Sequence, residues 1–174
     1  MTRQSASRSF FKHCIEHKVI IKLAGGGDSP CYVAEYKADN APNRRVESTI
    51  TFNKHEILLT VYYSQTGDRI VRESENINEL LKVLNFLNNS VLYVYDGYAL
   101  FSPGFVVSDN GEIILTTVIP YDFYGLFREA TDFYITAFCP QLLNAVAVDV
   151  FLTLFGEISS NEAIKRLKRV LLEG

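Results

Sequence analysis

The chain has 174 residues, of which 48% are hydrophobic and 21% charged, and its formal net charge at pH 7 is −3. This length and composition are typical of one folded domain with a sizeable core, and they exclude a disordered chain. The slightly negative charge also argues against a nucleic-acid-binding protein, which needs a basic excess.

The first half of the sequence predicts a helix followed by about four strands. The helix is expected at residues 7–18, where apolar residues recur at helical spacing. A β-branched run at 19–23 follows, and the glycine-rich segment 25–30 breaks the chain. Strands separated by turn residues are then expected at 31–36, 48–53 and 57–63, with a short further strand at 69–74.

The middle of the sequence predicts a helix and then a hairpin. Residues 76–90 form an amphipathic pattern, in which Asn76 as cap and Glu79 three residues later approximate a capping box. A strand at 98–107 is expected to turn through Asn110-Gly111 into a strand at 112–120, because Asn-Gly between apolar runs is a strong hairpin signal. Pro103-Gly104 inside the first strand predicts a bulge or an edge position.

The last third of the sequence is expected to be helical. Asp122 is predicted to cap a helix that Pro140 breaks or kinks, and Pro140 suits the first turn of the next helix. Residues 142–155 are apolar on nearly every side, so this helix must be buried by the sheet or by a second copy of the chain. Ser159 and Glu162 form a capping box for the last helix. This order of elements predicts one α+β domain over residues 1–174, with an antiparallel sheet flanked by helices.

Three further features of the sequence predict a cytoplasmic protein. No charge-free apolar run reaches 18 residues, so no membrane span is expected. The N-terminus lacks an apolar segment followed by a small-residue cleavage site, so no secretory signal is expected. The three cysteines, Cys14, Cys31 and Cys139, are odd in number and form no C-x-x-C pair, which is typical of reduced thiols.

The segment His13-Cys14-Ile15-Glu16-His17 has the H-x-x-E-H spacing of a zinc-protease motif. On a helix, His13 and His17 share a face and can both bind zinc, and Glu16 can act as the base. Zinc needs a third protein ligand, however, and the remaining histidine, His55, falls in a predicted turn. We therefore favour a solvent-facing helix with both histidines exposed and no cofactor, and we keep a zinc-dependent hydrolase as the alternative.

Three other motifs have simple structural interpretations. The glycines at 25–27 lack the Lys-Ser/Thr of a phosphate-binding loop and predict a loop. The segment 109–112 has too few spaced oxygens for a calcium loop and predicts a turn. The last helix carries four cations, which favour a solvated helix face over an acidic or nucleic-acid partner; they are Lys165, Arg166, Lys168 and Arg169.

A cluster of tyrosines is the most suggestive feature for function. Interfaces use tyrosine because the side chain combines apolar area with a hydroxyl group, although packing within the sheet explains the same pattern. We predict contacts with a partner protein, or with a second copy in a homodimer, through four residues, namely Tyr93, Tyr95, Tyr98 and Phe105. Tyr121 and Tyr124 extend the same cluster.

Several turn, cap and helix positions within residues 77–166 follow one recognisable pattern; they are Leu84-Asn85, Asp109-Asn110-Gly111-Glu112-Ile113, Tyr134 with Pro140, and Gly156, Ser159, Glu162 and Ala163. In these positions the segment resembles the YbjN-like family of bacterial proteins. The resemblance implies a fold like that of type III secretion chaperones, and the family carries the label of sensory transduction regulator. We therefore expect a non-enzymatic, chaperone-like or regulatory protein that binds a protein partner, with neither nucleic acid nor membrane as a ligand.

Overall fold

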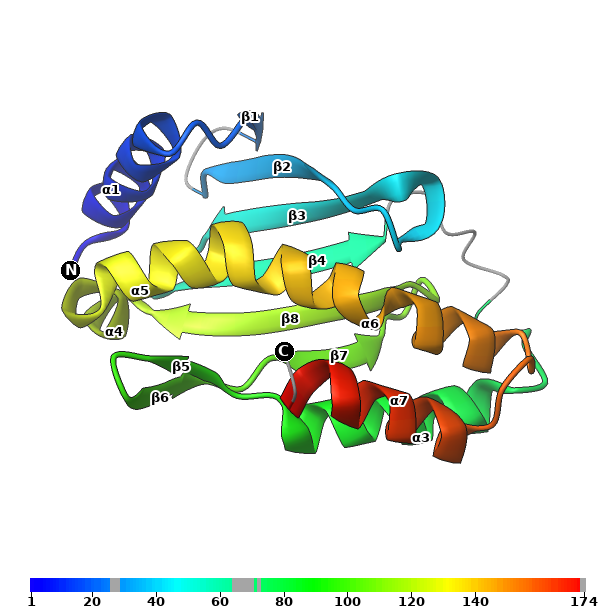
Figure 1. Cartoon of the computed structure of the whole chain (residues 1–174). Helices are drawn as coiled ribbons and strands as arrows, with labels where there is room; N and C mark the ends of the chain where they lie inside the picture. Colours follow the sequence, from blue (N-terminus) through cyan, green and yellow to red (C-terminus); the bar gives the residue numbers. More distant parts are fainter. Residues whose placement is uncertain (26–28, 64–70, 72, 173–174) are drawn as a thin grey trace.

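Six antiparallel strands form the central sheet of the computed structural model, which describes all residues except 26–28, 64–70, 72 and 173–174 (Figure 1). From one edge to the other the strands are β1 (Ile21–Gly25), β2 (Cys31–Lys37), β3 (Arg45–Phe52), β4 (Glu56–Tyr63), β8 (Ile113–Pro120) and β7 (Gly104–Val107). The predicted α+β class with an antiparallel sheet flanked by helices is confirmed. Of the short strand predicted at 69–74, residues 69, 70 and 72 lie outside the described residues, and the described residues 71, 73 and 74 are not in a strand.

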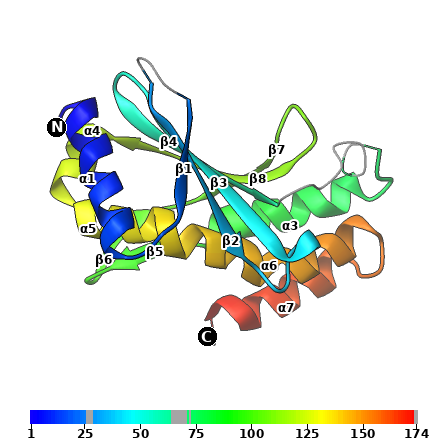
Figure 2. The ribbon, with the colours of Figure 1, turned by 90° about the horizontal axis from the view of Figure 1, so that it is seen from above.

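The helices gather on one side of this sheet (Figure 2). They are α1 (Arg3–Glu16), α3 (Ile77–Ser90), α4 (Tyr121–Leu126), α5 (Arg128–Phe133), α6 (Cys139–Leu154) and α7 (Ser160–Leu172), with a 3-10 turn at Pro42–Arg44 and a π-helical turn, η2, at Tyr134–Phe138. Alternation along β3 explains the arrangement, because Val46, Ile50 and Phe52 are buried toward the helices while the intervening residues point the other way. The Phe10 ring attaches α1 to the same face, 5.9 Å from the Phe52 ring.

One continuous helix crosses the middle of the helical layer. It runs through α5, η2 and α6 from Arg128 to Leu154, so the chain is not broken at Pro140, which lies in the first turn of α6 as predicted. Pro140 cannot donate the backbone hydrogen bond of a regular helix, and the wider π-helical turn lies directly before it. By length and composition this helix could cross a membrane, but 56% of its most apolar window is buried inside the structure.

Two helix starts differ from the sequence prediction. The first helix begins at Arg3 rather than Ser7, because the Thr2 hydroxyl accepts a hydrogen bond from the backbone N–H of Ser5 at 3.3 Å. Asp122 lies inside the first turn of α4 instead of capping it, and its carboxylate is 3.2 Å from the N-terminal amine of Met1.

The predicted strand at 98–107 is two strands in two different sheets. Its first part, β6 (Tyr98–Phe101), pairs with β5 (Tyr93–Tyr95) in a separate hairpin, and its second part is β7 of the main sheet. The hairpin turns at Asp96 and Gly97, whose φ angles of 49° and 79° are both positive. Asp-Gly suits such a turn, so the sequence did contain a signal for this hairpin.

The junction between α6 and α7 uses the predicted capping residues in a different way. Ser159 accepts a hydrogen bond from the Glu162 backbone N–H at 3.3 Å, as its place in the predicted capping box requires. Glu79, which the sequence assigned to the start of α3, instead accepts a hydrogen bond from the Ser160 backbone N–H at 3.2 Å. A carboxylate at that helix end is favoured by the exposed N–H groups and the helix dipole, so Glu79 ties α3 to α7.

Candidate functional site

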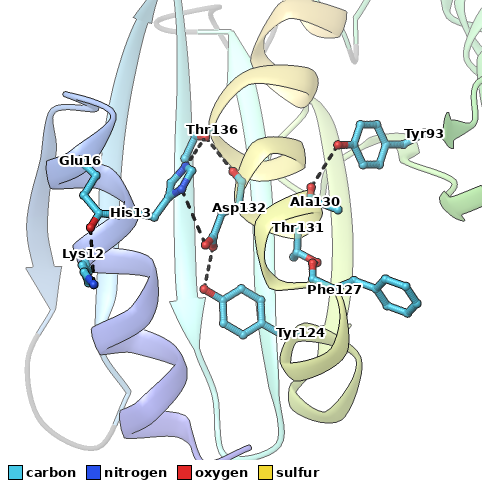
Figure 3. A network of polar contacts seen from close by, with 10 residues as sticks. All are labelled: Lys12, His13, Glu16, Tyr93, Tyr124, Phe127, Ala130, Thr131, Asp132 and Thr136. Carbon is cyan, nitrogen blue, oxygen red and sulfur yellow. Dashed lines mark hydrogen bonds and ion pairs between the residues drawn. The ribbon is translucent and has the colours of Figure 1, made fainter. Parts of the chain in front are cut away.

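A buried polar network joins α1 to α5 (Figure 3). His13 Nδ1 lies 3.9 Å from Asp132 Oδ2, and His13 Nε2 lies 3.4 Å from the Thr136 hydroxyl. The Tyr124 hydroxyl donates a hydrogen bond to Asp132 Oδ1 at 2.7 Å. Both ring nitrogens of His13 therefore face protein groups, and the carboxylate of Asp132 is held between two helices.

Burial controls the protonation of this network. Removal of Asp132 from water raises the pKa of its carboxyl group to about 6, and the Tyr124 hydrogen bond opposes the rise. Burial also lowers the pKa of His13, and the neighbouring His17 lowers it further. Burial raises the pKa of the Cys14 thiol to about 12, so Cys14 stays protonated near neutral pH.

In the part of the chain that the structure describes, the H-x-x-E-H spacing does not bring three metal-ligating side chains together. The His13 and His17 rings lie 4.3 Å apart, but His13 points inward, so the expectation that both histidines face solvent is wrong for His13. Glu16 pairs with Lys12 at 3.5 Å. Among the described residues, no three His, Cys, Asp or Glu side chains come within reach of one metal ion. A hollow of about 260 Å³ opens onto the network: His13, His17 and Asp132 line it together with the charged side chains of Lys12, Glu16, Arg128 and Glu129.

The four predicted contact residues do not lie on one surface. Tyr93 is 4% exposed and donates a hydrogen bond to the Ala130 carbonyl at 3.1 Å, and Phe105 is 2% exposed. Because their side chains pack inside the protein, they cannot contact a partner in this conformation. Tyr95 and Tyr98 are 36% and 65% exposed on the β5–β6 hairpin, and their role in binding stays a prediction. Tyr121 and Tyr124 are buried as well.

The outward face of the sheet has no described helix on it (Figure 2). Leu58 on β4 is directly opposite Val118 on β8, and Tyr62 is directly opposite Ile114. Between these two apolar pairs, Thr60 is opposite Thr116. Val106 on β7 extends the strip beyond Ile114. We call these seven residues the sheet face. The sequence shows their alternation but not that the face would remain uncovered.

The two edges of the sheet differ in accessibility. At the β7 edge, the Asn88 side chain accepts a hydrogen bond from the Phe105 backbone N–H at 2.6 Å and donates one to the Phe105 carbonyl at 2.9 Å. Asn88 thus occupies the backbone groups that another strand would use. At the opposite edge, no described strand or side-chain amide covers β1.

The cations of the last helix are partly engaged within the chain. Arg166 pairs with Glu162 and lies 3.8 Å from Asp149, and the Lys168 amine lies 5.8 Å from the centre of the Phe86 ring. These contacts use two of the four cations, which is consistent with the expected solvated helix face.

Comparisons of the chain with protein-family models, with curated proteins and with solved structures give no match. The functional interpretation therefore depends on the sheet face, the sheet edges and the polar network.

Proposed function

We propose that this protein is a non-enzymatic protein-binding module of the YbjN-like type that acts in the bacterial cytoplasm. Its partner, a segment of another protein or a second copy of the chain, binds to the sheet face. The observation that carries the proposal is that an apolar strip crosses a sheet surface with no described helix upon it. A sheet that is apolar on both sides normally packs both sides against another layer.

The composition of the sheet face favours a protein partner. Leu58, Val118 and Ile114 offer apolar area, while Thr60 and Thr116 keep the centre of the strip polar enough for the free protein to stay in water. Soluble proteins rarely leave large apolar patches unpaired, and such patches often mark interaction sites. A surface of mixed polarity is typical of reversible, non-obligate complexes.

The polar network supports the non-enzymatic part of the proposal. Both nitrogens of His13 are turned toward Asp132 and Thr136, so a molecule in the adjoining hollow would have to displace one of these contacts to meet a free ring nitrogen. Burial raises the pKa of both Cys14 and Cys139, which disfavours their reactive thiolate forms. The free thiols also favour a reducing compartment.

Two groups of positions that resemble the YbjN-like family lie at junctions of this fold, whereas Leu84-Asn85 lies inside α3. The Asp109–Ile113 segment spans the β7–β8 turn, and Gly156 to Ala163 spans the junction between α6 and α7. Residues at such places determine where elements begin and end, so they support a shared fold and leave the partner open.

The sheet face is tested with one charge substitution and a matched control. Val118→Arg places a cation in the apolar strip, and Val170→Arg makes the same change at an exposed position on α7. Light scattering with size-exclusion chromatography reports a homodimer, and affinity capture from the native cell extract with mass spectrometry reports a partner. We expect Val118→Arg to lose the dimer or the captured protein and Val170→Arg to keep it. Equal behaviour of the wild type and Val118→Arg in both assays would contradict the proposal.

A further inference from the structure

We infer that the open edge of β1 binds an extended segment of a partner protein, in which apolar residues alternate with acidic residues. The inference rests on the proposed protein-binding function but concerns the edge of the sheet rather than its face. The segment would add to the sheet as a further strand, a recurrent mode of peptide recognition.

The backbone of β1 is available for this addition. β1 is the outermost strand, and it pairs with β2 on its inner side through Ile21, Lys22 and Leu23. An unpaired edge offers backbone donors and acceptors to another strand. The opposite edge lacks this capacity, because the Asn88 amide already pairs with Phe105. The regular part of β1 is short, since the register shifts between Leu23 and Gly25, so the side chains must contribute to affinity.

Exposed apolar side chains lie along this edge. Ile20 and Leu23 are 78% and 64% exposed, which is high for such residues next to a strand edge. A hollow of about 410 Å³ lies at the start of β1, and Val19, Ile20, Ala137 and Pro140 contribute its apolar lining. This volume accommodates a large apolar side chain of the added segment.

Two exposed cations favour an acidic partner. Lys18 and Lys22 are exposed, and neither forms an ion pair with a described residue, whereas Lys12 pairs with Glu16. Carboxylates on the added segment would neutralise both. A second copy of β1 would double the positive charge at the contact, and like charges across paired strands are unfavourable. We therefore assign the edge to an acidic partner and not to β1 of another copy.

The register of β1 explains why acidic and apolar residues must alternate. Lys22 is opposite Val33, which is opposite Thr49 on the outward side of the sheet. Leu23 is opposite Tyr32, whose ring lies 6.2 Å from Phe11 on the helical side. An added strand alternates in the same way, so its acidic side chains meet Lys22 on one side and its apolar side chains meet Leu23 on the other.

Synthetic peptides of defined sequence test the inference in place of the natural partner. The probe is a labelled eight-residue peptide of alternating valine and glutamate, and fluorescence anisotropy measures its binding to the full chain. The first control replaces glutamate by lysine, and the second keeps the side chains but carries N-methyl groups on alternate amides, which removes strand hydrogen bonds. We expect the valine–glutamate peptide to bind and both control peptides not to bind. Its binding should shift the backbone amide signals of Ile21–Leu23 in the NMR spectrum.

Matched variants of the protein locate the site. Lys22→Glu should weaken binding of the acidic probe about fivefold or more, the size expected for one partly exposed charge pair. Lys165→Glu, the same change on α7, should leave binding unchanged. Binding that tolerates N-methylation or Lys22→Glu, or no binding of the acidic probe, would overturn the inference. If the protein forms a homodimer and Lys22→Glu changes its stability, a second copy of the chain occupies the β1 edge, and the assignment to an acidic partner is wrong.

The outcome can be separated from that of the proposed function. Val118→Arg leaves the β1 edge intact, so it should bind the acidic probe like the wild type. Loss of the captured partner in Val118→Arg with normal peptide binding supports both proposals, whereas an unchanged capture with normal peptide binding refutes only the role of the sheet face.

Discussion

The imidazole of His13 lies 3.9 Å from the carboxylate of Asp132, although most of the chain separates them in sequence. The pair lies at the contact between α1 and the long helix, with Tyr124 on the far side of the carboxylate. Because Asp132 is only 2% exposed, its charge is poorly hydrated and its protonation affects the stability of the fold. The network therefore predicts a measurable pH dependence.

Asp132→Asn should change the pH profile of stability. The folded-state pKa of Asp132 is raised from 3.8 to about 6, so the folded state holds the proton longer than the unfolded state does. Stability due to this group is present below pH 4 and is lost as the pH rises through 6, by about 2 to 3 kcal/mol. The free energy of unfolding of Asp132→Asn minus that of the wild type should therefore increase between pH 4 and pH 7.

Urea unfolding at several pH values measures this difference. His13 acts in the opposite sense, because its lowered pKa costs stability as the pH falls below 6.5, so the variant must be compared with the wild type at each pH. Asp109→Asn, at an exposed turn position, is the control and should follow the wild type. If the free energies of unfolding of Asp132→Asn and the wild type differ by the same amount from pH 4 to pH 7, the raised pKa of Asp132 is refuted.

Asn88→Leu should destabilise the protein by about 2 kcal/mol, because it leaves the backbone N–H and carbonyl of Phe105 without their partner. It should also promote self-association, since it uncovers the β7 edge. Asn89→Leu is the matched control on the same helix, because Asn89 bonds to Asn85 at the surface and to no other described residue. Chemical unfolding and light scattering measure the two effects, and equal results for both variants would contradict the role of Asn88.

Gly156→Ala and Gly97→Ala should differ in cost although both glycines have positive φ angles, of 73° and 79°. A Cβ atom at Gly156 would lie 2.7 Å from Asn76 Nδ2, whereas nothing lies within 4 Å of one at Gly97. We expect about 1 kcal/mol of destabilisation at Gly97 and about 2 kcal/mol at Gly156. Thermal unfolding of both variants checks this order, and a larger cost at Gly97 would be inconsistent with it.

Removal of the side-chain hydroxyl group should lower the stability of the protein at Tyr93 but not at Tyr98. Tyr93→Phe removes the hydrogen bond to the Ala130 carbonyl and should cost about 1 kcal/mol of stability. Tyr98→Phe changes an exposed side chain and should stay within about 0.5 kcal/mol of the wild type. Chemical unfolding compares the two. If Tyr98 contacts a partner, Tyr98→Ser should reduce capture of that partner without changing stability.

The protein should contain no stoichiometric zinc when it is purified without an affinity tag. To bind a metal ion, the His13 ring would have to give up its contact with Asp132 at Nδ1 or its contact with Thr136 at Nε2. Elemental analysis of the wild type and of His13→Ala provides the test. One zinc ion per chain that disappears in His13→Ala would favour the hydrolase alternative over a binding module.

Local patterns in the sequence predicted most of the fold. The alternation in β3 and β4 and the stripe of α3 identify those elements, because each pattern depends on residues that are neighbours in the chain. The failures have physical causes. The turn at Asp96-Gly97 separates β5 from β6 inside an apolar run, and the π-helical turn before Pro140 allows the long helix to continue.

The candidate sites could not be predicted in the same way. The contact of His13 with Asp132 depends on how α1 packs against the long helix, and nothing local to either residue indicates it. Asn88 stands in an ordinary Leu-Asn-Asn run on a helix, so its hydrogen bonds to a strand edge carry no sequence signal. The exposure of Tyr95 and Tyr98 and the burial of Tyr93 are also tertiary properties.

The side chain of Asn88 has a consequence for higher-order assembly. A protein with two free sheet edges can join its copies end to end into a filament, but here one end is already satisfied by the chain itself. The β1 strand of a second copy would have to displace Asn88 before it could pair with the Phe105 backbone on β7. The fold therefore resists linear polymerisation through its two sheet edges.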